Sequence, residues 1–549
     1  MIDHYKRYSE DVKVLKKLGI NSYRFSIAWS RILPDGTLEG GVNQEGIDFY
    51  NKLINELLAN DITPFVTILH FDYPLSLFRK GGFLNSSIVK HFKDYSDVLF
   101  KAYGDRVKHW TTFNEIEITA IFNYMHGFDM PFPEKCQTTK ECREVYTLMH
   151  ISILSHAESV KLYREKYQAK QGGEIGIVLS IEDYIPFSRK PEDLAATVRL
   201  RDFSTGWVLD PLFKGDYPTS MKVLVGDRLP KFTEEEQKLI KGSLDFIGIN
   251  YYRSFFGKDE PNKFLINSLD NYDSLAIKQG NFVNPQGLYN VLVFLKQTYN
   301  NPNIYITENG IGSGTIKQPL EDKHRIDYLA THINYVKQAL DAEVNVKGFF
   351  VWSAFDTFEF HQGFSDKWGL IYIDFADNLK RVPKRSARWY RWFLIGNTNF
   401  FWLLIFTIIK IHVSYSYLGC KNLVSEKIYN KGLISVTLSY CNFSLIGFYS
   451  SLMQTEGSAH EGGRGPSVWD SIFMSEQAKT IKDIDKCGTM IDHYKRYSED
   501  VKVLKKLGIN SYRFSIAWSR ILPDGTLEGG VNQEGIDFYN KLINELLAN

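Results

Sequence analysis

Short runs of apolar, β-branched and aromatic residues alternate with longer amphipathic stretches along residues 1–395. The stretch 45–60 is typical of the second kind, because its apolar side chains recur near the helical period. Alternation of this kind predicts parallel β-α units. The predicted strands begin at seven positions: Tyr23, Thr63, His109, Glu174, Phe246, Ile304 and Lys347. Seven β-α units are one short of a closed (β/α)8 barrel, or TIM barrel, so we expect an eighth strand from elsewhere in the chain.

The chain contains the same 60 residues twice. Residues 490–549 repeat residues 1–60 without a change. Solenoid repeats are shorter, more numerous and divergent. We therefore interpret the repeat as a partial tandem duplication of a larger unit.

Polar residues follow the predicted strands where a barrel of this class builds its active site, at the carboxyl ends. Glu115 closes the run "HWTTFNE" and Glu308 closes "IYITEN". Amide, imidazole, carboxyl and phenol groups stand at comparable places: His70, Asp72, Asn114, Asn250 and Tyr252. Two carboxyl groups in one pocket are the machinery of glycoside hydrolysis, in which one donates a proton and the other attacks the anomeric carbon or activates water.

Charge and hydropathy argue against two other classes of protein. Lys and Arg number 65 against 64 Asp and Glu, so no basic field favours nucleic-acid binding. The strongest apolar run, Phe400–Ile409, has ten residues, whereas a spanning helix needs about twenty, so we expect no membrane role. Charged residues follow Met1, so we expect no signal peptide there, and localisation stays open. Whether the chain forms a homo-oligomer also stays open.

Five cysteines are too few and too scattered for a disulfide scaffold or a metal cluster, so we expect no metal site. Only Cys136 and Cys142 are close in sequence, where they flank "QTTKE". The spacing fits a disulfide that closes a surface loop and equally fits two free thiols.

Several motifs together resemble the signatures of the family 1 glycoside hydrolases, the retaining β-glucosidases. They are "YRFSIAWSRILP", "TFNE", "FIGINYY", "ITENG" and "GFFVWS...FE". The stretches "GDYPTSMKVLVGDRLPKFTEEE" and "HEGGRGPSVWD" resemble the plant branch. The resemblance covers residues 1–395 and 443–549. It implies a TIM barrel that hydrolyses small-molecule β-glucosides by double displacement, with no metal or cofactor.

The resemblance also implies a role for each matched residue. Glu115 would be the general acid/base and Glu308 the nucleophile. Arg24 and Tyr252 would hydrogen-bond the nucleophile. The remaining matches concern the sugar: His70, Asn114 and Glu359 would bind its hydroxyls, and Trp352 would form the aromatic wall on the aglycone side.

Two positions depart from the family pattern. Ile116 replaces the usual proline after the acid/base, and Phe360 replaces the usual tryptophan after Glu359. The loss of the indole donor predicts an altered sugar preference. The retained Glu115 argues against the thioglucosidases of the family, which often carry glutamine there.

A third departure concerns the strand with which family members begin. In this chain it does not precede the seven predicted strands. Its counterpart is recognisable at Phe443–Gly457, with Gln454 in the sugar-binding place, and residues 396–442 match nothing in the family. Residues 443–549 could complete a barrel with residues 61–395 as a circular permutant, or only 443–457 could insert beside residues 1–60. Large side chains in this strand would overpack a barrel interior, so a third reading is a damaged enzyme.

The sequence therefore leaves several functions open. The first is an active β-glucosidase. The second is a catalytically impaired carbohydrate-binding or inert product. Among enzymes, a diglycosidase or a hydroxyisourate-hydrolase-like activity also remains.

Overall fold

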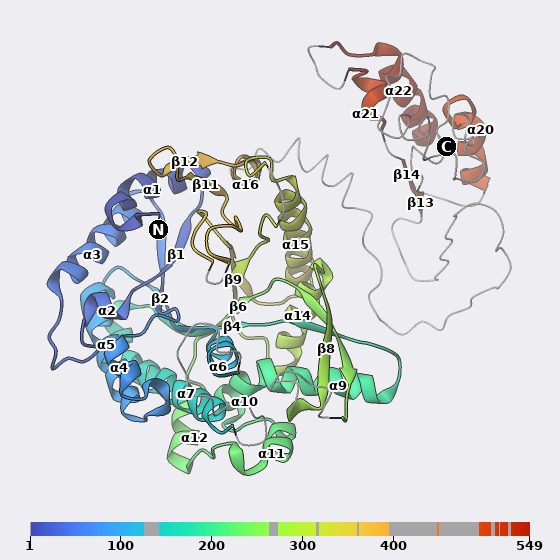
Figure 1. Ribbon diagram of the computed structural model, residues 1–549. Coiled ribbons are helices and arrows are strands. Elements are labelled where there is room, and N and C mark those ends of the chain that lie inside the picture. Colours follow the sequence, from blue (N-terminus) through green and yellow to red (C-terminus); the bar gives the residue numbers. More distant parts are fainter. Residues whose placement is uncertain are drawn as a thin grey trace. The chain divides into compact units, whose positions relative to one another are not determined.

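The computed structural model divides the chain into two compact units, Met1–Leu403 and Leu404–Asn549 (Figure 1). The residues that the structure describes are 2–125, 142–262, 273–314, 318–359, 362–394, 447–449, 493–506, 511–514, 516–524 and 529–548.

A seven-stranded parallel sheet forms the centre of the first unit, in the order β1-β2-β3-β4-β6-β9-β10. The strands are β1 (Ser22–Ser26), β2 (Thr63–Leu69), β3 (His109–Asn114), β4 (Glu174–Ser180), β6 (Phe246–Asn250), β9 (Ile304–Asn309) and β10 (Val346–Val351). All seven strands predicted from the apolar runs are confirmed. Within the described residues β1 and β10 are the two edges, so the unit is a TIM barrel that lacks one strand.

Helices surround this sheet (Figure 1). The stripe predicted in residues 45–60 is confirmed: it lies in α3, where its apolar side chains are buried. The helices are α1 (His4–Leu18), α2 (Trp29–Ile32), α3 (Gln44–Ala59), α4 (Leu75–Arg79), α5 (Ser87–Tyr103), α6 (Ile116–Met125), α7 (Glu144–Tyr163), α8 (Ala169–Gln171), α9 (Pro191–Arg201), α10 (Trp207–Lys214), α11 (Thr219–Val225), α12 (Glu234–Ile240), α14 (Pro285–Thr298), α15 (Lys323–Asp341) and α16 (Arg385–Leu394).

Two smaller sheets lie outside the barrel strands. One has three strands, β5 (Asp183–Pro186), β7 (Ser254–Asp259) and β8 (Ala276–Phe282). The other is an antiparallel hairpin of β11 (Ile371–Asp374) and β12 (Lys380–Pro383). The apolar runs did not predict these strands, because they are short and mix polar with apolar residues.

Aromatic rings fill the barrel near the amino ends of its strands. Phe65 stacks on His109 with centroids 5.3 Å apart, and it meets Phe246, Tyr305 and Phe350 edge-on at 5.1 to 5.7 Å. Tightly packed rings close this end to substrate. The carboxyl ends of the strands are left for a site.

The second unit repeats the local structure of residues 4–59. It contains α20 (His493–Lys506), β14 (Ser511–Arg513), α21 (Trp518–Ile521) and α22 (Gln533–Ala548). Its buried cluster of Val501, Phe538, Tyr539 and Leu542 matches residues buried in the first copy. The strand β13 (Gly447–Tyr449), inside the predicted range 443–457, pairs in parallel with β14. This pairing places β13 beside the second copy of the β1 sequence.

No described helix combines the length and hydropathy that a membrane span requires. Within the described ranges, no group of three or more His, Cys, Asp or Glu side chains could hold a metal ion.

Candidate active site

The candidate catalytic residues meet at the carboxyl ends of neighbouring barrel strands. Asn114 and Asn250 are the last residues of β3 and β6, and Asn250 is paired in register with Glu308 of β9. The strand register shifts just before Asn114 and again at Asn250. Such irregularities re-aim side chains at the end of a strand, and they are common beside active sites.

Both carboxylate oxygens of Glu308 accept hydrogen bonds. Arg24 Nη1 donates to Oε1 at 2.8 Å, and the Tyr252 hydroxyl donates to Oε2. The Arg24 and Glu308 side chains are only 7% and 6% exposed, so this is a buried ion pair. Burial and the charge of Glu308 raise the pKa of Tyr252 well above its usual value, so the phenol keeps its proton and remains a donor.

Arg24 connects four strands of the barrel. It donates to Asn114 Oδ1 at 2.6 Å and to Thr67 Oγ1 at 3.2 Å, in addition to its contact with Glu308. A planar guanidinium holds several acceptors in fixed directions, so it fixes the mutual orientation of these side chains.

Glu115 lies in a different environment from Glu308. It follows β3 with a positive φ of 46°, an uncommon conformation for a residue other than glycine, and its N–H donates to the Val178 carbonyl at 2.8 Å. Burial, followed by the charges of Glu308 and Glu117, raises the pKa of Glu115 well above its usual range. Asn250 Nδ2 donates to Glu115 Oε1 at 2.8 Å and opposes that rise. The protonated form of Glu115 is therefore favoured, as a general acid needs.

The predicted sugar-binding groups lie in the same part of the barrel. Asn114 Nδ2 lies 3.3 Å from His70 Nε2, and the His70 ring stacks on Trp352 with centroids 6.0 Å apart. Burial, and then the charge of Arg24, lower the pKa of His70 to about 3, so the imidazole is neutral and can accept this hydrogen bond.

Glu359 is placed by the loop after β10. Thr357 Oγ1 donates to Glu359 Oε1 at 3.0 Å. Burial raises the pKa of Glu359 to about 6, against the opposing effects of the hydrogen bonds from Thr357 and Trp352. The structure thus describes nine predicted site residues in one region: Arg24, His70, Asn114, Glu115, Asn250, Tyr252, Glu308, Trp352 and Glu359.

Five other residues singled out in the sequence have different outcomes. Phe360, Gln454 and Cys136 lie outside the described residues. Cys142 is disulfide-bonded, so the free-thiol alternative is wrong for this residue. Ile116 is the first residue of α6, a position where proline is favoured and other residues are accepted.

Sequence reasoning missed three residues that support the site. Thr307 Oγ1 donates to Asn250 Oδ1 at 2.7 Å, which fixes the amide that contacts Glu115. Thr67, on β2, accepts a hydrogen bond from Arg24. Glu117 is buried in the first turn of α6, where its Oε1 accepts the N–H of Ser180. Thr307 and Glu117 lie within two residues of Glu308 and Glu115 in the sequence, and that proximity was the only available signal; Thr67 has none.

Comparisons with known proteins agree with this arrangement. The family model described as "Glycosyl hydrolase family 1" matches residues 1–398 and 442–549. Beta-glucosidase 24 of Oryza sativa subsp. japonica is 45% identical over 420 residues, which cover 72% of this chain and 83% of the relative. Furostanol glycoside 26-O-beta-glucosidase of Hellenia speciosa is 47% identical over 416 residues, which cover 71% and 74%.

Solved structures show the same likeness. The rice Os3BGlu6 beta-glucosidase superposes with a TM-score of 0.68 at 36% identity, and the match covers 71% of this chain and 87% of that one. The fungal beta-glucosidase of Humicola insolens, solved with glucose, also gives 0.68 at 36% identity, over 72% and 88%.

Proposed function

This chain belongs to glycosyl hydrolase family 1 and is a retaining β-glucosidase, and we propose that Glu308 is its nucleophile and Glu115 its general acid/base. The observation that carries this assignment is the contrast between the two environments. Glu308 is paired with Arg24 and accepts from Tyr252, whereas Glu115 is buried with a raised pKa. Two carboxyl groups whose environments differ in this way take the acid and nucleophile roles.

In the first step, an oxygen of Glu308 attacks the anomeric carbon and the bond from that carbon to the leaving oxygen breaks. Glu115 transfers its proton to that oxygen, so the aglycone leaves as a neutral alcohol or phenol. Arg24 and Tyr252 hold the Glu308 carboxylate in place for the attack.

In the second step, water attacks the same carbon and releases Glu308. Glu115 now accepts the proton of that water. Esterification removes the negative charge of Glu308, and that charge is one cause of the high pKa of Glu115. The pKa of Glu115 therefore falls in the glycosyl-enzyme, which suits its change from acid to base.

The substrate is a small-molecule β-glucoside, and we propose that its sugar lies against Trp352 with hydroxyls bound by His70, Asn114 and Glu359. These groups give polar contacts beside an aromatic surface, which is the usual composition of a ligand site. The comparisons do not favour an inert product, a diglycosidase or a hydroxyisourate-hydrolase-like activity.

Chemical rescue with azide tests the two assignments separately. In Glu308→Gly, azide should fill the space of the lost carboxylate, displace dinitrophenolate from a 2,4-dinitrophenyl β-glucoside with inversion and give the α-azide. In Glu115→Gly, azide should attack the covalent intermediate formed from the same substrate, release Glu308 and give the β-azide, with faster turnover. Failure of both variants to form an azide product, or the reverse stereochemistry in the two variants, would contradict the assignment.

A further inference from the structure

The loop after β10 carries two proposed sugar-binding residues, Trp352 and Glu359, and a buried carboxylate lies between them. Asp356 is 1% exposed. Its N–H donates to the Ile371 carbonyl at 3.0 Å, and its Oδ1 accepts the N–H of Gly369 at 2.8 Å. Asp356 therefore attaches this loop to the strand that returns as β11.

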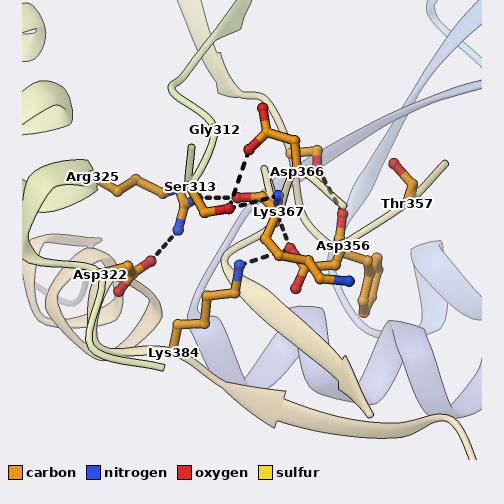
Figure 2. Close-up of polar contacts among 12 residues, drawn as sticks. Gly312, Ser313, Asp322, Arg325, Asp356, Thr357, Asp366, Lys367 and Lys384 are labelled. Carbon is orange, nitrogen blue, oxygen red and sulfur yellow. Dashed lines mark hydrogen bonds and ion pairs between the residues drawn. The ribbon is translucent and has the colours of Figure 1, made fainter. Parts of the chain in front are cut away.

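A fully buried lysine completes this attachment. Lys384 lies between β12 and α16, and its Nζ donates to Asp356 Oδ1 at 2.7 Å (Figure 2). Its own N–H donates to the Leu370 carbonyl at 3.0 Å. The ion pair joins the sugar-binding loop to the start of α16.

A second group of contacts fixes the chain on both sides of this ion pair, at Ser386 and at Lys367. Asp322 accepts the N–H of Ser386 at 2.8 Å, and it also accepts from Arg325 at the start of α15. Arg325 donates in addition to the Lys367 carbonyl. Figure 2 shows Asp322, Arg325 and Lys384 near the loop that carries Asp356. The base of the loop is thus fixed by buried polar contacts.

Stability alone is a poor explanation for the buried pair. Burial lowers the pKa of Lys384 to about 8 even though Asp356 opposes the shift, and burial raises the pKa of Asp356 even though Lys384 opposes it. Desolvation is the largest influence on the pKa of both groups, and it acts against the attraction between them. In addition, Asp356 Oδ2 is buried with no hydrogen-bond partner within the described part of the chain. Apolar pairs of similar volume are often as stable as buried ion pairs, which favours a geometric role for these charges.

We propose that Asp356 and Lys384 are positioning residues for sugar binding and act through Glu359. Asp356 fixes the backbone where the turn begins. The next residue, Thr357, donates to the Glu359 carboxylate at 3.0 Å, and Glu359 N–H closes the turn onto the Gly363 carbonyl at 2.7 Å. Displacing Asp356 would move the donor that orients Glu359. This inference rests on the proposed sugar-binding role of Glu359.

A double-mutant cycle between Asp356→Asn and Glu359→Gln tests the inference. Two quantities are measured: kcat/KM for p-nitrophenyl β-glucoside, and the Kd of 1-deoxynojirimycin, a cationic imino-sugar mimic of glucose, by calorimetry. We expect Asp356→Asn to weaken both by about tenfold to hundredfold in the parent protein. In the Glu359→Gln background the same change should cost less than about threefold, because residues that act as one unit are not additive.

Lys384→Met should also weaken kcat/KM and imino-sugar binding strongly in the parent protein and only slightly in the Glu359→Gln background. If Asp356→Asn fails to fold, the Lys384→Met cycle tests the inference in its place. The matched control is Lys380→Met, at the start of β12, the strand that precedes Lys384; it removes an exposed ion pair with Asp377. It should change both quantities by less than about twofold.

Equal losses in the two backgrounds would overturn the inference, since a merely structural defect adds to the effect of Glu359→Gln. Unchanged kinetics and binding in both Asp356→Asn and Lys384→Met would overturn it too. The imino-sugar readout does not need the chemical step. If the protein does not hydrolyse the glucoside but the effects of Asp356→Asn and Glu359→Gln on the Kd of the imino sugar are still non-additive, the proposed catalytic residues are contradicted and the positioning role is kept.

Discussion

Replacing Glu117 by glutamine should stabilise the protein at neutral pH and leave its stability unchanged in mild acid. Glu117 is 2% exposed, and its Oε2 has no hydrogen-bond partner among the described residues. Burial raises its pKa from 4.5 to about 8; the hydrogen bonds from its own N–H and that of Ser180 act against this rise. The folded protein therefore retains a proton that the unfolded chain releases.

The size of the effect follows from proton linkage. A raised folded pKa gives stability that is fully present below pH 4.5 and is lost as the pH rises towards 8. The loss is about 1.36 kcal/mol per pH unit, so the 2.5 units from pH 4.5 to 7 cost roughly 3 kcal/mol. Glutamine cannot titrate, and its Oε1 can still accept the Ser180 N–H. Glu117→Gln should therefore gain roughly 3 kcal/mol over the parent protein at pH 7.

Urea unfolding of both proteins at several pH values, followed by tryptophan fluorescence, measures this difference. Comparing the variant with the parent at each pH cancels the titration of groups that Glu117 does not influence; Glu115, whose pKa the charge of Glu117 raises, is the exception. Glu165→Gln, at an exposed position, is the control and should show no pH-dependent difference. A difference for Glu117→Gln that is the same at pH 4.5 and pH 7 would refute the reasoning.

Three further changes test the site. Glu115→Gln should lower kcat/KM by about 10² to 10⁴-fold for alkyl β-glucosides and far less for a glucoside with a dinitrophenyl leaving group, and the fall of kcat/KM at high pH should disappear. Equal losses on both substrates would argue against an acid role. Arg24→Met breaks a buried ion pair, so the free energy of unfolding should fall by about 3 to 5 kcal/mol in urea, and an unchanged value would contradict the burial of that pair. Phe360→Trp restores the indole expected from the family resemblance and should lower KM for glucosides relative to other β-glycosides; an unchanged ratio would show that the phenylalanine does not set sugar preference.

The main elements could be predicted from the sequence because their signals are local. The run "TPFVTIL" that begins at Thr63 is rich in apolar and β-branched residues, and it forms β2 with the same bounds. Glu115 and Glu308 could be brought together because the carboxyl ends of parallel strands meet at one end of a barrel. The short strand β8, "AIKQGNF", gave no such signal because its residues alternate poorly between apolar and polar.

Other features depend on contacts between distant residues. Lys384 reads as a surface residue in the sequence, and only the fold shows that it is buried against Asp356. The partner of the strand near residue 447 could not be chosen either, since residues 22–24 and 511–513 are identical and offer it the same edge. In the structure that strand pairs with Ser511–Arg513.

The most direct test of the account is to trap the covalent intermediate. The full-length protein is incubated with a 2-deoxy-2-fluoro-β-glucoside carrying a dinitrophenyl leaving group, and its intact mass and peptides are then measured. We predict a gain of one fluoroglucosyl group, mapped to the peptide that contains Glu308, and no gain in Glu308→Gln. An adduct on another residue, or no adduct in a protein that still hydrolyses β-glucosides, would contradict the assignment of Glu308 as the nucleophile.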